Sequence, residues 1–205
     1  LASQGIKSNY AVVYAGDEQK DIDPKFASMQ GNHVILNVPG IAEEDVWLEC
    51  TSQSLPFNYL GDFTDNRHVL LIKEDGGEIV KTPNYECDIN LEETLCEIDL
   101  SEDAFTANIK KQSKGIPYGN NYHIQGQKDK DKNIYYKEVF GNLQGIHFDH
   151  LSFENDKEQA SFSEELEFTG KKFYTTAGNR ILLPLNFIEP EIDMVSRDED
   201  RHYPV

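Results

Sequence analysis

The chain has 205 residues, with 37 Asp and Glu against 19 Lys and Arg, and its formal net charge at pH 7 is −18. A surface of this sign repels phosphate backbones and anionic lipid headgroups, which argues against a nucleic-acid or membrane-surface partner. Hydrophobic residues make up 38% of the chain and aromatic residues 11%, which argues against disorder of the whole chain, and no run reaches the roughly 20 apolar residues of a membrane span.

Residues 1–82 show mainly a period of two in their apolar positions, which is typical of β-strands. The runs that we predict as strands are, in chain order, NYAVVYA, HVILNV, DVWLEC, HVLLIK and GEIVKTP. Turns are predicted at Asp75–Gly77 and around Pro83, where Gly and Pro interrupt the pattern. Because Thr82–Asn84 makes a natural boundary, we expect one domain at residues 1–82 and a second at residues 84–205.

The second domain is predicted to be a β-sandwich with one short helix. Apolar and polar residues alternate in DINLEETLCEIDL and AFTANIKKQS, which predicts a hairpin with one solvent-exposed face. Residues 114–130 are rich in Gly, Asn and Lys and predict a loop. In the segment that follows, Tyr135, Val139 and Leu143 stand at helical spacing and predict the helix. Strands return in HFDHLSFEN, ASFSEELEF, KKFYTTA and NRILLPLNF, so the whole chain is predicted to be α+β and predominantly β.

His33 and Glu49 stand at the ends of two neighbouring predicted strands. His33 opens HVILNV and Glu49 closes VWLE, and Pro39 and Gly40 between them favour a reversal. Strands joined in this way bring the imidazole and the carboxylate to adjacent ends of one sheet, within reach of a hydrogen bond. A cysteine-type acyl-transfer centre needs a thiol, a histidine that takes its proton, and a group that orients the imidazole. His33 and Glu49 suit the last two roles.

Two patterns in the second half contain some of the residues of a metal site. His147, Asp149 and His150 do not share one face of a regular strand, because neighbouring side chains alternate. The segment from Asp129 matches the first oxygen positions of a calcium loop, but Ile134 stands where that loop requires Gly. We therefore predict no metal site. The sequence also contains no Gly-rich phosphate loop, nucleotide fingerprint or serine nucleophile elbow.

The residues around His33 and Glu49 form a longer pattern. It consists of Asn32-His33, a strand, a turn and Trp47-Leu48-Glu49-x-Thr51, followed by Pro56-Phe57-x-Tyr59-Leu60-Gly61, Arg67 and the strand VLLI. This pattern resembles the second half of a transglutaminase-like domain, in which, as in papain-like enzymes, a cysteine on a helix faces histidine and aspartate on a sheet. Residues 84–205 resemble the β-rich domain of unknown function that follows this domain in multidomain bacterial proteins.

The resemblance implies that the parent protein is a cysteine-dependent peptidase or amide acyl transferase, which acts on a peptide or protein substrate and uses no metal or organic cofactor. It implies that His33 is the general base and then acid, and that Glu49 holds the imidazole in the productive tautomer. It also implies a periplasmic or secreted location. Family members usually have aspartate where Glu49 stands, so the carboxylate here is one methylene further from the backbone.

The nucleophile is the missing part of this pattern. The family cysteine lies upstream of the residues that correspond to Gly5 and Ile6, and this chain begins at Leu1. We therefore expect a fragment without its nucleophile that is inactive alone. Its apolar inner face is expected to be covered by an N-terminal segment or by self-association, or residues 1–30 are expected to be poorly ordered.

The three cysteines of the chain, Cys50, Cys87 and Cys96, show no metal-ligand spacing and no dense disulfide pattern. Cys50 directly follows Glu49 and is expected to point to the opposite face of the strand, away from His33. The sequence leaves open whether Cys87 and Cys96 pair. A non-catalytic β-module that docks a partner or neighbouring domains is the alternative function. On that view the histidine and the carboxylate are structural.

Overall fold

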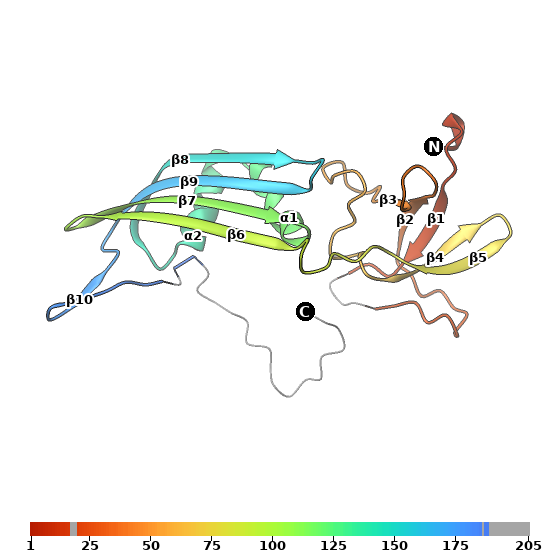
Figure 1. Cartoon of the computed structure of the whole chain (residues 1–205), viewed down its shortest axis with the longest axis horizontal. Coiled ribbons are helices and arrows are strands. Elements are labelled where there is room, and N and C mark those ends of the chain that lie inside the picture. Colours follow the sequence, from red (N-terminus) through yellow and green to blue (C-terminus); the bar gives the residue numbers. More distant parts are fainter. Residues whose placement is uncertain (17–19, 186, 189–205) are drawn as a thin grey trace. The chain divides into compact units, whose positions relative to one another are not determined.

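The computed structural model describes residues 1–16, 20–185 and 187–188. Strands predominate in it, and its helices are few and short (Figure 1). The predicted fold class, α+β and predominantly β, is therefore confirmed. Among the described residues, no helix has both the length and the apolar character that crossing a membrane requires.

Contacts divide the chain into two compact units. Of the described residues, the first comprises those within 1–95, 109–126 and 152–165, and the second comprises 96–108, 127–151, 166–185 and 187–188. The domain boundary that the sequence suggests at residues 82–84 stays a prediction.

The first sheet contains five antiparallel strands in the order β3-β2-β1-β4-β5 (Figure 1). These strands are β1 (Asn9–Val13), β2 (His33–Val38), β3 (Val46–Leu48), β4 (His68–Lys73) and β5 (Gly76–Lys81). All five correspond to runs with the period of two in the sequence. β3 ends one residue before Glu49, and β2 begins at His33.

One face of this sheet forms the core of its region. Val13 lies opposite His33, and Ala11 lies opposite Ile35, so these residues share a face. The buried hydrophobic cluster on it consists of Ala11, Val13, Ile35, Trp47, Leu60, Val69 and Leu71. Leu60 comes from the loop between β3 and β4. The chain's own loop therefore takes part in covering the inner face that was expected to need an N-terminal segment or a second copy, and self-association stays a prediction.

The second sheet contains four long strands in the order β6-β7-β9-β8 (Figure 1). They are β6 (Leu91–Leu100), β7 (Ala104–Lys114), β8 (Gln144–Asp156) and β9 (Ser161–Lys171). The remaining elements are η1 (Ala2–Gln4), α1 (Ile116–Asn121), η2 (Tyr122–Gly126), α2 (Asp129–Val139), β10 (Thr175–Ala177) and β11 (Arg180–Leu182).

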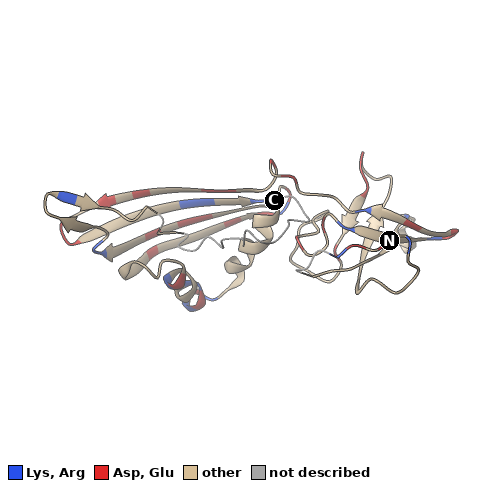
Figure 2. Ribbon diagram, turned by 90° about the horizontal axis from the view of Figure 1, so that it is seen from below, with Lys and Arg blue, Asp and Glu red and all other residues tan. Residues whose placement is uncertain are grey.

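The predicted β-sandwich is not what the described residues form in the second half. Helices, rather than a second sheet, lie against one face of the four-stranded sheet (Figures 1 and 2). The rings of Tyr136 and Phe140 on and after α2 pack against Phe148 of β8, and Phe140 also packs against Phe168 of β9. The only other sheet of this half in the described residues is the short pair β10-β11.

Two further details of the second half differ from the sequence prediction. The loop predicted at residues 114–130 is wrong, because α1 and η2 occupy most of it. Gly115 takes a positive φ of 63° and starts α1, and Tyr118 is fully buried, so tertiary packing stabilises a helix too short to show a periodic pattern. The predicted short helix is present, but it starts at Asp129, before the apolar stripe begins.

Candidate functional site

His33 and Glu49 form a hydrogen-bonded pair at one end of the first sheet. His33 is the first residue of β2, and Glu49 directly follows its antiparallel neighbour β3. The Nε2 atom of His33 lies 2.8 Å from Oε2 of Glu49. The expectation that this pair lies within hydrogen-bond reach is confirmed, because a short reversal between two paired strands returns residue 49 to the neighbourhood of residue 33.

The carboxylate of Glu49 is buried and fully engaged. Its side chain is 1% exposed, whereas that of His33 is 20% exposed. The second oxygen, Oε1, accepts hydrogen bonds from the backbone N–H of Thr51 at 2.8 Å and from Thr51 Oγ1 at 2.6 Å. Each oxygen of Glu49 therefore has a fixed partner, and the carboxylate has one orientation relative to the imidazole.

These contacts determine the charge of Glu49. Burial alone raises the pKa of its carboxyl, but the hydrogen bonds from Thr51 and His33 oppose burial and prevail, so the pKa lies below its ordinary value. An ionised carboxylate only accepts hydrogen bonds, so Nε2 of His33 is the donor. In the neutral imidazole the other nitrogen, Nδ1, then has a free lone pair. No residue in the described part of the chain hydrogen-bonds to Nδ1.

The aromatic ring of Phe63 packs against the imidazole of His33. Its ring centroid lies 5.9 Å from that of His33, with an interplanar angle of 63°, which is an edge-to-face contact. Phe63 is not predictable as a site residue from the sequence, because it stands in GDFTDN, a polar loop segment without periodicity. Only the tertiary arrangement of this loop places the ring beside His33.

The other residues of the sequence pattern support the pair structurally. Asn32 pairs with the backbone of Ala15 in both directions: Nδ2 donates to Ala15 O at 2.9 Å, and Oδ1 accepts from Ala15 N–H at 2.7 Å. Asn32 thus joins the end of β1 to the start of β2. Trp47 lies in the buried core, and its backbone N–H donates to Asn58 Oδ1 at 2.8 Å. Thr51 is the residue of the pattern that contacts Glu49 directly.

Among the described residues, no thiol contacts His33. All three cysteines are free, so Cys87 and Cys96 do not pair. Cys50 is exposed, and its Sγ lies 3.8 Å from the carbonyl oxygen of Leu48. Burial raises the pKa of the Cys96 thiol, which lowers its thiolate content at neutral pH. The described residues therefore provide two of the three groups of a cysteine-type centre.

The residues that resembled metal ligands are dispersed. Asp129 and Asp131 lie in the first turn of α2, and no loop forms there. His147 and Asp149 are exposed on β8, with Nε2 and Oδ1 3.9 Å apart. Within the described ranges, no group of three or more His, Cys, Asp or Glu residues has the geometry to hold a metal ion.

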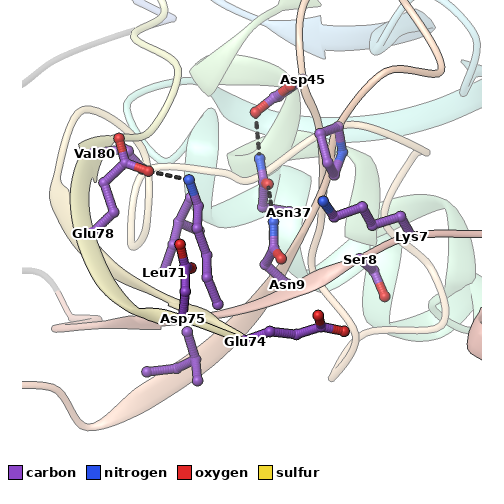
Figure 3. Close-up of a pocket in the computed structure, with 13 residues that line it drawn as sticks. Lys7, Ser8, Asn9, Asn37, Asp45, Leu71, Glu74, Asp75, Glu78 and Val80 are labelled. Carbon is purple, nitrogen blue, oxygen red and sulfur yellow. Dashed lines mark hydrogen bonds and ion pairs between the residues drawn. The ribbon is translucent and has the colours of Figure 1, made fainter.

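A polar cavity lies at the other ends of the same strands (Figure 3). Its volume is about 960 Å³, and its lining includes Asn37, four positions after His33 on β2. Asn9 Nδ2 donates to Asn37 Oδ1 at 3.1 Å, and Asn37 Nδ2 donates to Asp45 Oδ2 at 2.9 Å. Neither His33 nor Glu49 lines this cavity, so it is separate from the candidate site.

Comparison of this chain with protein-family models, with curated proteins and with solved structures found no match.

Proposed function

We propose that this chain carries the base-and-carboxylate half of a transglutaminase-like, cysteine-dependent acyl-transfer site. The reaction is attack of a thiolate on the carbonyl of a peptide or amide bond, as in a peptidase or an amide acyl transferase. The thiol comes from polypeptide outside residues 1–205, and the 205-residue chain is inactive alone. The location proposed with this activity is periplasmic or secreted.

The observation that carries the proposal is the bonding of the two imidazole nitrogens. Nε2 of His33 donates to a carboxylate that is 1% exposed, while Nδ1 has no hydrogen-bond partner in the described structure. A general base needs this asymmetry, since one nitrogen must be held in place while the other takes a proton.

In the proposed reaction, Nδ1 of His33 removes the proton from the thiol. The ionised Glu49 stabilises the imidazolium that forms, because it accepts the Nε2–H bond at 2.8 Å. The thiolate then adds to the carbonyl carbon, and His33 returns the proton from Nδ1 to the leaving amine. Water or a second amine releases the acyl group from sulfur. Thr51 keeps Glu49 ionised throughout by donating two hydrogen bonds to Oε1.

The test is thiol alkylation of a polypeptide extended upstream of residue 1, with each modified cysteine identified by mass spectrometry. A cysteine activated by His33 is expected to react with iodoacetamide about tenfold faster at pH 7 than the exposed Cys50. The variants His33→Ala and Glu49→Gln should abolish this difference. Cys50 in the same molecules serves as the internal control, and its rate should not change.

Activity of the 205-residue chain provides the converse test. It should show no amide hydrolysis or transamidation, and His33→Ala should not change the alkylation of its cysteines. Hydrolysis that disappears in His33→Ala would show that the nucleophile is one of Cys50, Cys87 and Cys96. If no cysteine of the extended polypeptide depends on His33, the alternative is favoured, a non-catalytic β-module that docks a partner or neighbouring domains.

A further inference from the structure

Arg67 is a buried cation beside the candidate site. It lies directly before β4, and 1% of its surface is exposed. Its backbone is fixed by Thr82 on both sides: the Arg67 N–H donates to Thr82 Oγ1 at 2.9 Å, and the Thr82 N–H donates to Arg67 O at 2.9 Å. Burial of a guanidinium costs free energy unless its N–H groups are hydrogen-bonded, so the partners of these hydrogen bonds indicate what Arg67 does.

The guanidinium joins two segments that are far apart in the sequence. Nη1 donates to the carbonyl of Tyr14 at 2.7 Å, and Nη2 donates to the carbonyls of Gly16 at 2.6 Å and Asp62 at 3.1 Å. Tyr14 and Gly16 follow β1, whereas Asp62 lies in the loop between β3 and β4. The planar guanidinium has five donors in a fixed arrangement, so one side chain serves three carbonyls.

The segment after β1 and the loop between β3 and β4 both lie next to residues that contact or pair with His33. Asp62 is the neighbour of Phe63, whose ring packs against the imidazole. The N–H of Gly16 donates to the carbonyl of Phe63 at 3.3 Å, which ties the two segments together a second time. Val13, just before the first segment, lies opposite His33 in the β1–β2 register. The bonds of Arg67 thus hold the backbone on either side of the imidazole.

We propose that Arg67 is a positioning residue for the His33–Glu49 pair. It holds the loop at residues 62–63 so that the Phe63 ring blocks rotation of the imidazole and keeps Nε2 directed at Glu49. The inference rests on the proposed function, since positioning serves catalysis only if His33 is a base. Arg67 itself does not touch a reacting atom.

The experiment is NMR of the 205-residue chain labelled with ¹⁵N-histidine, with His33 assigned through a His33→Gln variant. The unmodified chain should show one His33 tautomer, with a proton on Nε2 that exchanges slowly because Glu49 accepts it. Arg67→Lys retains the charge but not the planar set of donors, and Phe63→Leu removes the ring. Each should lose the slow exchange and give a mixture of tautomers, and the double variant should lose no more than either single variant.

Two variants separate positioning from general loss of stability. Phe63→Tyr keeps the ring, and the His33 signals should stay as in the unmodified chain. Phe162→Leu changes a fully buried ring that stacks on Phe153 in the second sheet. It should lower the urea midpoint of unfolding while the His33 tautomer and exchange remain unchanged.

The proposal is overturned if Arg67→Lys folds and leaves the His33 tautomer and exchange unchanged. If Arg67→Lys does not fold, Phe63→Leu decides, and unchanged His33 signals in that variant overturn the proposal. Because this readout needs no turnover, failure of the proposed function remains distinguishable. In that case no thiol depends on His33 in the extended polypeptide, although Arg67 still controls the His33 tautomer.

Discussion

The two sheets of this protein bury different mixtures of groups, although the second also buries the polar side chains of Ser113, Ser161 and Glu164. Around the first sheet, several buried side chains are polar or charged: Asn37, Thr64, Asp65, Arg67 and Thr82. On the helix-covered face of the second sheet, aromatic rings dominate, and Phe105, Phe140 and Phe168 are all at most 2% exposed. Buried polar groups require exact partners, whereas apolar burial is not directional. The first sheet is therefore suited to hold a chemical site, and the second is suited to provide stability.

The largest expected change in stability comes from a substitution in the aromatic cluster of the second sheet. Phe168 is fully buried and contacts the rings of Phe105, Phe140 and Phe148. Phe168→Ala should lower the free energy of unfolding by about 3–5 kcal/mol, through lost burial and the cavity that remains. Urea unfolding measures this loss, and Phe57→Ala, at a ring that is 69% exposed, is the control with an expected change under about 0.5 kcal/mol. A small loss at Phe168 would show that the aromatic cluster is not the main source of stability.

The second prediction concerns a buried charge near the first sheet. Burial raises the pKa of Asp65 to about 6, although the nearby positive charge of Arg67 opposes this shift. The folded value exceeds the ordinary value of 3.8, so the contribution of Asp65 to stability is fully present below pH 3.8 and is lost as pH rises through about 6. At pH 7 the ionised group therefore destabilises the fold.

Asp65→Asn should accordingly raise the free energy of unfolding at pH 7 by roughly 2 kcal/mol and leave it nearly unchanged at pH 3.5. Denaturant titrations between pH 3.5 and pH 8 measure this difference. The measurement at pH 3.5 is the internal control, because the Asp65 carboxyl of the folded chain is neutral there. A profile that remains the same in Asp65→Asn would mean that the carboxyl is ionised throughout and is compensated by Arg67.

The smallest expected effect is at Thr51. Thr51→Val removes the 2.6 Å bond from Oγ1 to Glu49 but keeps the backbone N–H bond, so it should cost about 1 kcal/mol of stability at pH 7. It should also raise the pKa of Glu49, because this hydrogen bond is one of the three that hold the pKa down.

The sign of the pH dependence follows from the lowered pKa of Glu49. Its stabilising contribution is present above the ordinary value of 4.5 and is lost as pH falls through the folded value. In Thr51→Val the folded pKa lies closer to 4.5, so the pH-dependent loss should be smaller in total and should end at a higher pH, as denaturant unfolding followed by circular dichroism at a series of acidic pH values would show. Thr51→Ser keeps the hydroxyl and should behave like the unmodified chain. If Val and Ser behave alike, the hydroxyl does not control Glu49.

The sequence by itself determined the strands of both halves and the meeting of His33 with Glu49. The pair is predictable because a period of two marks the strands, and one short reversal connects β2 to β3. The β-sandwich and the loop at residues 114–130 were mispredicted, since α1 and η2 have no apolar period of their own and form by packing against the sheet.

Only the tertiary structure decided which groups surround that pair. Thr51 stood in the sequence pattern, but nothing in the pattern indicated that its hydroxyl bonds to Glu49. Phe63 contacts His33 across 30 positions, and Arg67 reaches the carbonyl of Tyr14 across 53, in segments without regular periodicity. Such contacts depend on how the loops pack in the tertiary structure. The local backbone preferences that make a strand predictable from its sequence contain no information about them.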